Sequence, residues 1–467
     1  MTSYCKYPKK IFILLPIVLL SACKASDWLD EKNDISQVVP TTLKDCQAIM
    51  DQSEYINQGY TRSHEIASDN YYAKEGAFVS LTDEINAYTW SRIVPFESSL
   101  EWYNAYRRVF YCNLVLETLN RIETSSSNDK QTKDDLQAQA LFIRAYTFYD
   151  LSIQYAHPYS SSSINDLGIP MRLESDINLP TIRSSVRQNY DQIIADLQKA
   201  KDLVLPVVPI YKTRASKIAI FATLARIYLS MEHYSEAKVM TDSCLNIYNR
   251  LLNYNDGYIP SPNSPASATY PFTDKFNGEV LFYSSMLFSN LIAGGSDGYI
   301  DSVLYKSYNT NDLRKTLFYQ GPTPPIKFTG SYSGGMLVCM TGPCTDEMYL
   351  IRAECLARSG NTIAAMDDLN TLLMTRWKKN TFLKYTATDS KDALQQIIAE
   401  RNKELIFRGI RWTDLRRLNN DSNFILTLTR TYNNSSYSLK PNSDQYTFPL
   451  PEDIISATGM QQNEGWY

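Results

Sequence analysis

Apolar side chains recur at helical spacing in several separate stretches of the chain, and no other feature constrains the fold as strongly. Over residues 102–116, five side chains follow intervals of four, three, four and three: Trp102, Tyr106, Val109, Asn113 and Leu116. These intervals place all five on one face of a helix. The same pattern occurs over residues 138–153, 215–229, 237–247, 349–356 and 365–372. The chain is therefore predicted to be mostly α-helical.

The helical stretches form helix–turn–helix units of roughly 34 residues in which small alanines alternate with larger side chains, as in tetratricopeptide repeats. Each unit must bury its apolar stripe against a neighbour, so we expect about four helix pairs to stack. Residues 57–98 and 250–335 break the helical pattern and are rich in Gly, Ser, Pro and aromatic residues. They are expected to be loop-rich insertions with little β structure, and loops on a rigid scaffold commonly carry binding sites.

The N-terminus has the features of a bacterial lipoprotein signal peptide. Three lysines precede an apolar run over residues 11–20, and Leu-Ser-Ala-Cys follows at residues 20–23. Ten helical residues span roughly 15 Å, about half of a bilayer core, so this run suits a signal peptide better than a membrane span. The cysteine favours a lipidated N-terminus over ordinary secretion.

These features predict the division of the chain. Residues 1–22 are expected to be the signal peptide, and residues 23–40 the lipidated N-terminus and tether. The remaining residues, 41–467, are expected to form a single helical domain with its main insertion at about 250–335. Two or more acyl chains on Cys23 would anchor that domain stably to a membrane.

Composition narrows the possible partners. The formal net charge is −4 without a long basic run, so nucleic acid is not an expected partner. The histidines lie far apart in the sequence and near no matching cysteine spacing, so neither a metal nor a cofactor is predicted. Cys339 and Cys344 flank a turn-like segment and form either a local disulfide or two unlinked thiols. The 34 tyrosines suit wet binding surfaces and helix-pair cores alike.

Motifs spread over nearly the whole chain resemble the SusD/RagB family. They appear in the order expected for that family: residues 27–30 (Asp-Trp-Leu-Asp), 143–151, 168–170 (Gly-Ile-Pro), 183–197, 400–417, 448–451 (Phe-Pro-Leu-Pro) and 461–463 (Gln-Gln-Asn). The resemblance lies in the order and total coverage, because no single piece would suffice. It implies a helical scaffold of the SusD type.

The most specific of these motifs, residues 400–417, alternates acidic and basic side chains. Glu400 and Glu404 are a like-charge pair one helical turn apart, so pairing along the helix surface does not explain them. Bidentate contacts between these carboxylates and the guanidinium groups of neighbouring helices would explain the pair. We predict a structural ionic network here rather than a catalytic site. Arg408 stands where family members often carry an acid, so a local ion pair is expected to be altered or lost.

The resemblance implies a lipid-anchored protein of the outer membrane that captures a nutrient, usually a glycan, and caps a SusC-like TonB-dependent transporter. Ligand contacts in such proteins come mainly from aromatic and polar loop side chains. The candidates in this sequence are Asp69, Asn70, Tyr71, Tyr72, Tyr88, Trp90, Tyr258, Tyr299, Tyr305, Arg314 and Tyr319. Each could equally pack inside a loop, and Asp69 also suits the bracing of a turn.

Two other functions stay open. A surface glycosidase would need two carboxylates roughly 5–10 Å apart across a cleft, and the sequence lacks the motifs of phosphate-binding loops, zinc proteases and nucleophile elbows. A protein-interaction scaffold would bind no sugar. The binding hypothesis predicts that Trp90→Ala or Tyr299→Ala weakens glycan retention without lowering the melting temperature.

Overall fold

Helices account for most of the regular structure in the computed structural model, which describes residues 40–79, 84–96, 99–203, 205–257, 271–292, 295–321 and 324–466. The prediction of a mostly helical protein is confirmed. Cys23 and Tyr258 lie outside the described residues. The long helices are α6 (Leu100–Arg121), α7 (Ser127–Tyr155), α8 (Val186–Asp202), α9 (Lys217–Ser230), α10 (Tyr234–Ile247), α13 (Thr345–Arg358), α14 (Thr362–Met374) and α15 (Ser390–Glu404).

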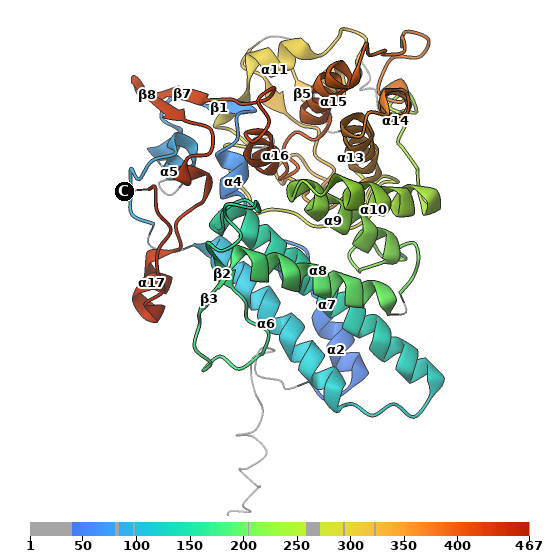
Figure 1. Cartoon of the computed structure of the whole chain (residues 1–467), viewed down its shortest axis with the longest axis vertical. Helices are drawn as coiled ribbons and strands as arrows, with labels where there is room; N and C mark the ends of the chain where they lie inside the picture. The colour runs from blue at the N-terminus through green and yellow to red at the C-terminus, as the bar shows by residue number, and fades with distance from the viewer. Residues whose placement is uncertain are drawn as a thin grey trace, which may run out of the picture. The chain divides into compact units, whose positions relative to one another are not determined.

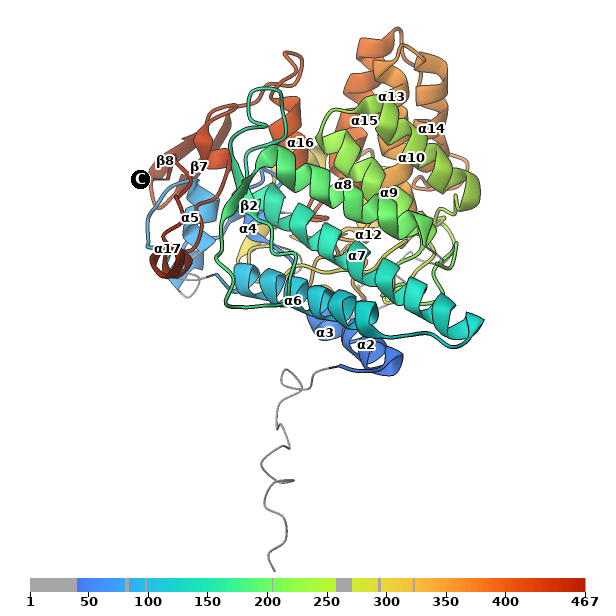
Figure 2. The same cartoon turned by 60° about the horizontal axis from the view of Figure 1, so that its bottom comes forward.

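These long helices form the scaffold. Helices α6, α7 and α8 lie side by side, followed by α9 with α10 and then by α13 with α14 and α15 (Figures 1 and 2). Short turns join α9 to α10 and α13 to α14, and Glu232 and Gly360 take positive φ angles of 60° and 85° in them. The helices begin at defined caps, such as the Ser185–Gln188 capping box of α8.

The apolar stripes face the interior of this scaffold. In α6, Trp102, Val109 and Asn113 are buried, and the whole predicted stripe of α7 is buried. The stripe of α10 ends differently, because Ile247 at the last helical position is 44% exposed. Burying one face of each helix against its neighbour is what stabilises stacked helix pairs.

Shorter elements cover the scaffold. The short helices are α2 (Leu43–Met50), α3 (Ser53–Ile56), α4 (Ser63–Ile66), α5 (Glu84–Thr89), α11 (Ser302–Ser307), α12 (Arg314–Leu317), α16 (Arg411–Leu418) and α17 (Glu452–Thr458), with 3-10 turns η2 (Ala77–Val79) and η4 (Asp444–Tyr446). Within the described ranges, no helix is long and apolar enough to span a bilayer.

The strands of the described residues form only two-stranded antiparallel sheets. They pair as β1 (Tyr71–Ala73) with β4 (Gly298–Ile300), β2 (Leu167–Pro170) with β3 (Arg183–Ser185), β5 (Tyr319–Gln320) with β6 (Lys327–Phe328), and β7 (Leu428–Tyr432) with β8 (Ser435–Leu439). The β1–β4 pair joins the two irregular regions that the sequence analysis singled out. The low strand content agrees with the prediction.

Candidate ligand-binding surface

The β1–β4 ribbon carries two tyrosines on its outer face. Tyr72 lies directly opposite Tyr299 in the antiparallel register. Because side chains alternate along a strand, Tyr71 and Ala73 point inward while Tyr72 points outward. Tyr72 is 41% exposed, and Tyr299 is partly exposed. The ring centroids lie 5.6 Å apart with an interplanar angle of 51°, so the rings form one tilted pair. We refer to Tyr72 and Tyr299 as the tyrosine pair.

The tyrosine pair offers both apolar and polar contacts. Its ring faces can stack against the C–H groups of a flat ligand, and each hydroxyl can donate and accept hydrogen bonds. Burial, together with the neighbouring Tyr299 and Asp301, raises the pKa of the Tyr72 hydroxyl. The hydroxyl therefore stays protonated at neutral pH and can donate a hydrogen bond.

Helix α11 follows strand β4 directly in the sequence and carries Tyr305. Asp301 caps the helix, because its side chain accepts hydrogen bonds from the backbone N–H groups of Val303 and Leu304 at 2.8 and 2.9 Å. Tyr305 is half-buried, and the Lys315 ammonium lies 5.0 Å from its ring centroid. Tyr305 therefore keeps part of its ring accessible next to a cation.

A surface cavity of about 460 Å³ lies where the first irregular region meets α6. Its walls include Arg62, Phe96 and Glu101. Glu101 is buried and accepts hydrogen bonds from the backbone N–H of Arg62 at 3.1 Å and of Ser63 at 3.0 Å. Arg62 also pairs with Glu84 at 3.0 Å. A cavity of this size, lined by the rings of Phe96, Tyr155 and Phe448 and by a few fixed charges, is adequate for a small ligand.

The sequence matches two family models. Residues 27–229 match the model described as "Starch-binding associating with outer membrane", and residues 346–466 match the model described as "SusD family". Together the matches span more than half of the chain. The chain belongs to the SusD family. No curated protein matches the sequence.

Solved structures of SusD proteins have the same fold. A SusD superfamily protein from Bacteroides thetaiotaomicron has a TM-score of 0.70 and 18% identity, covering 91% of this chain and 100% of its own. One from Bacteroides vulgatus has a TM-score of 0.70 and 19% identity, covering 92% and 100%. A laminarin-binding SusD-like protein has a TM-score of 0.63 and 15% identity, covering 90% and 98%. At these identities the likeness establishes the fold.

Most of the predicted ligand residues lie inside this SusD domain, so the surface is smaller than predicted. Six of them are buried: Asn70, Tyr71, Tyr88, Trp90, Arg314 and Tyr319. Tyr71 is on the inner face of β1, and its ring packs near Tyr88 with centroids 5.8 Å apart. The Tyr319 hydroxyl donates to that of Tyr308 at 2.8 Å. These side chains pack the loops from within, so we do not carry them forward as ligand contacts.

Arg314 belongs to an internal ionic cluster instead of the surface. Its guanidinium contacts the carboxylates of Asp312 and Glu400 at 2.6 Å and that of Glu404 at 3.0 Å. Glu404 also pairs with Arg376 at 2.8 Å. The predicted contacts from Glu400 and Glu404 to neighbouring elements are therefore present, and they account for the like-charge pair on α15.

Asp69 braces the turn before β1. Its carboxylate makes a bidentate ion pair with Arg411, with oxygen–nitrogen distances of 2.6 and 2.7 Å. Burial alone would raise the pKa of Asp69, but the Arg411 guanidinium lowers it below its usual range. The bracing role considered for Asp69 is thus the one its contacts support. Arg408 likewise forms an ion pair, with Asp346 at 3.5 Å, so the departure from the family pattern is locally accommodated.

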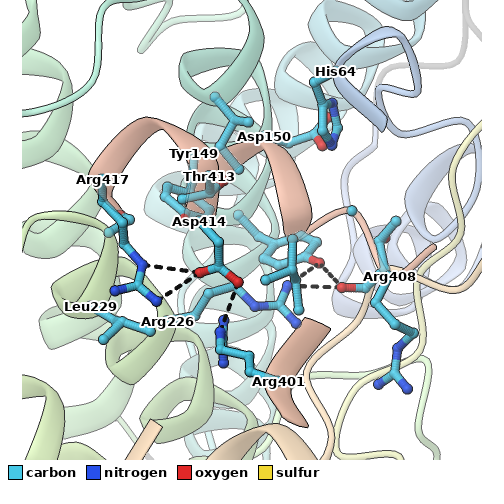
Figure 3. Close-up of a pocket in the computed structure, with 16 residues that line it drawn as sticks. His64, Tyr149, Asp150, Arg226, Leu229, Arg401, Arg408, Thr413, Asp414 and Arg417 are labelled. Carbon is cyan, nitrogen blue, oxygen red and sulfur yellow. Dashed lines mark hydrogen bonds and ion pairs between the residues drawn. The ribbon is translucent and has the colours of Figure 1, made fainter. Parts of the chain in front are cut away.

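A second charged cluster lies deep in the protein and is structural. Asp414 accepts from Arg401 at 2.8 Å and from Arg417 at 2.8 Å (Figure 3). Arg417 also pairs with Glu354. The enclosed space beside these groups is only about 20 Å³, which is enough for a water molecule but too small for a sugar.

Cys339 and Cys344 add no disulfide to the candidate ligand surface, and the described residues add no metal site to it. Cys339 and Cys344 are both buried, free thiols, so the unlinked alternative holds for this pair. Across the described ranges, no three His, Cys, Asp or Glu side chains gather as a metal site requires. The sequence analysis missed Arg62, Phe96 and Glu101. Arg62 and Glu101 are distant in the sequence and no motif spacing links them.

Proposed function

We propose that this protein captures glycans at the cell surface and delivers them to a SusC-like TonB-dependent transporter. The observation that carries the proposal is the tyrosine pair, two adjacent rings exposed on one face of the β1–β4 ribbon. Sugars present C–H faces that stack on such rings and hydroxyls that bond to phenols. The family's starch-binding description and the laminarin-binding relative support a glycan as the ligand class.

The proposed ligand surface consists of the tyrosine pair and the accessible part of Tyr305. The cavity beside Arg62 and Glu101, whose lining includes none of these tyrosines, is a second proposed contact site. Tyr258 remains a proposed contact outside the described residues. Lipidation of Cys23 would hold this surface at the outer membrane, which agrees with the family's description. Replacing Cys23 with Ser should abolish the incorporation of labelled fatty acid into the full chain, and continued incorporation would contradict the anchor.

Affinity electrophoresis of the full chain through gels that contain different polysaccharides tests the binding proposal. The wild-type protein should be retarded by at least one polysaccharide. Tyr72→Ala and Tyr299→Ala should each weaken that retention roughly tenfold, because each removes a stacking ring. Tyr211→Ala is the matched control, since Tyr211 is 59% exposed but lies on a different segment.

Three outcomes would contradict the proposal. Retention by none of a broad set of polysaccharides would favour a protein-interaction scaffold. Equal loss in Tyr72→Ala and Tyr211→Ala would remove the tyrosine pair from the ligand surface. Shortening of the polysaccharide after incubation with pure protein would reveal a glycosidase, because a binding protein leaves chain length unchanged.

A further inference from the structure

Arg430 occupies an unusual position beneath the β1–β4 ribbon. It lies on β7, and its side chain points inward, where it is buried. Within the described part of the chain, no carboxylate makes an ion pair with it, and the carboxylate of Asp69 acts on it only at longer range. Burying a charge without an ion-pair partner is costly unless other groups stabilise it. The groups that surround Arg430 therefore need to be identified.

Three aromatic rings surround the Arg430 guanidinium. Its central carbon lies 5.3 Å from the ring centroid of Tyr71, 4.1 Å from that of Tyr88 and 4.6 Å from that of Trp90. Each distance is within the range of a cation–π interaction. All three rings were predicted as ligand contacts, and they hold an internal cation instead.

The same guanidinium also donates hydrogen bonds to three backbone carbonyls, those of Ile66, Ser68 and Tyr88. These carbonyls belong to the two segments that flank and support β1. Trp90 is fixed in addition by a 2.9 Å hydrogen bond from its indole N–H to the carbonyl of Ala67. Trp90 has a φ of 52°, a conformation that a non-glycine residue adopts only when its surroundings enforce it.

We propose that Arg430 is a positioning residue that sets the orientation of Tyr72 in the tyrosine pair. Arg430 joins residues 66–71 to residues 88–90, and Tyr72 is the next residue after Tyr71 on β1. A displacement of Tyr71 inside the ribbon changes the strand that points Tyr72 outward. The inference rests on the proposed glycan-binding function, and it assigns a role in binding to a hairpin that contributes no exposed ring to the pair.

A double-mutant cycle on the full chain tests the proposal. Arg430→Lys keeps the charge but cannot bond three carbonyls in the planar geometry of a guanidinium. In the wild-type background it should weaken affinity for the polysaccharide found by electrophoresis about tenfold, and in the Tyr72→Ala background less than about twofold. An equal loss in both backgrounds, or no loss in either, would overturn the proposal.

Arg108→Lys is the matched control. Arg108 on α6 is also buried, donates to two backbone carbonyls, those of Tyr55 and Gln58, and lies 3.8 Å from the ring centroid of Tyr60, but it contacts none of the described residues of the proposed ligand surface. It should destabilise the protein to a similar extent and leave affinity within about twofold. Should Arg430→Lys fail to fold, Trp90→Phe replaces it, since this variant keeps a ring beside the cation but loses the bond to Ala67 and part of the buried indole that packs on the guanidinium.

A readout without ligand separates this proposal from the proposed function. With fluorotyrosine incorporated at position 72, Arg430→Lys should shift or broaden the fluorine resonance, whereas Arg108→Lys should leave it unchanged. An unchanged resonance in Arg430→Lys contradicts the positioning role, whether or not a glycan is found. Absence of any glycan affinity in the wild-type protein contradicts the proposed function and leaves this readout valid.

Discussion

The helical scaffold and the irregular regions use their aromatic residues in a similar way, although their sequences look different. In the scaffold, the ring centroids of Trp102 and Tyr106 on α6 lie 4.7 Å apart, one helical turn from each other along the stripe. In the first irregular region, the ring centroids of Phe78 and Tyr88 lie 5.3 Å apart, although the two residues follow no helical or strand periodicity. Both are contacts inside the protein. An aromatic-rich loop is therefore not by itself a binding surface, and only strand alternation brought Tyr72 outside.

The two regions differ in how they bury charge. At the end of the scaffold, the carboxylates of Glu400 and Glu404 on α15 bury Arg314 of the second irregular region. In the first irregular region, rings and backbone carbonyls bury Arg430 of β7. Paired charges fix helices rigidly to one another, whereas the cation of Arg430 fixes the shape of loops. The predictions below test this difference.

The largest expected effect is on the scaffold cluster. Arg314→Met leaves three carboxylates, those of Asp312, Glu400 and Glu404, without their common cation. The free energy of unfolding should fall by about 5 kcal/mol, as it does when a buried ion pair loses one partner. Chemical denaturation followed by circular dichroism measures it. Lys238→Ala is the control, because its exposed pair with Asp242 should be worth under about 1 kcal/mol. Similar losses in the two variants would show that the cluster is not a source of stability.

The next effect concerns the irregular region. Trp90→Ala removes a buried ring and its contact with Arg430, so we expect a loss of about 3 to 4 kcal/mol in the free energy of unfolding. This corrects the expectation from sequence that Trp90→Ala would leave the melting temperature unchanged. Thermal unfolding measures the change, and Tyr72→Ala should melt like the wild-type protein. A Trp90→Ala variant that also melts at the wild-type temperature would mean that these loops do not depend on their internal rings.

The sequence was sufficient for the scaffold because helical periodicity is a local property. The stripe of α7 could be read from intervals of three and four, and the contacts of Glu400 and Glu404 from their unfavourable spacing. The loops offered no such pattern. Whether Tyr71 or Tyr72 faces outward depends on pairing with β4, more than two hundred residues later in the chain. The contact between Arg430 and Trp90 depends on a hairpin that the sequence did not mark.

A smaller effect should appear in the pH dependence of stability. Burial raises the pKa of Glu65 to about 7, against opposing hydrogen bonds from Ser68 and Gly409 and the charge of Arg411. The folded protein therefore binds the proton more tightly than the unfolded chain. The contribution of Glu65 is complete below its ordinary pKa of 4.5 and is lost as the pH rises through about 7.

Comparison with Glu65→Gln isolates this contribution, because the buried His64 titrates in both proteins. The free energy of unfolding of the wild-type protein, relative to the variant, should fall by up to about 3 kcal/mol between pH 4.5 and 7. Denaturant titrations at several pH values measure the difference. A difference that rises with pH would show that Glu65 is ionised in the folded protein and paired with Arg411.

Hydroxyl-radical footprinting of the full chain, with and without the polysaccharide that retards it, tests the glycan-binding surface most directly. Oxidation of Tyr72 and Tyr299 should fall when the ligand binds, because their exposed rings become covered. Oxidation of Tyr211, which is 59% exposed on another segment, should stay the same. Unchanged oxidation of Tyr72 and Tyr299 in a sample saturated with ligand would contradict the account.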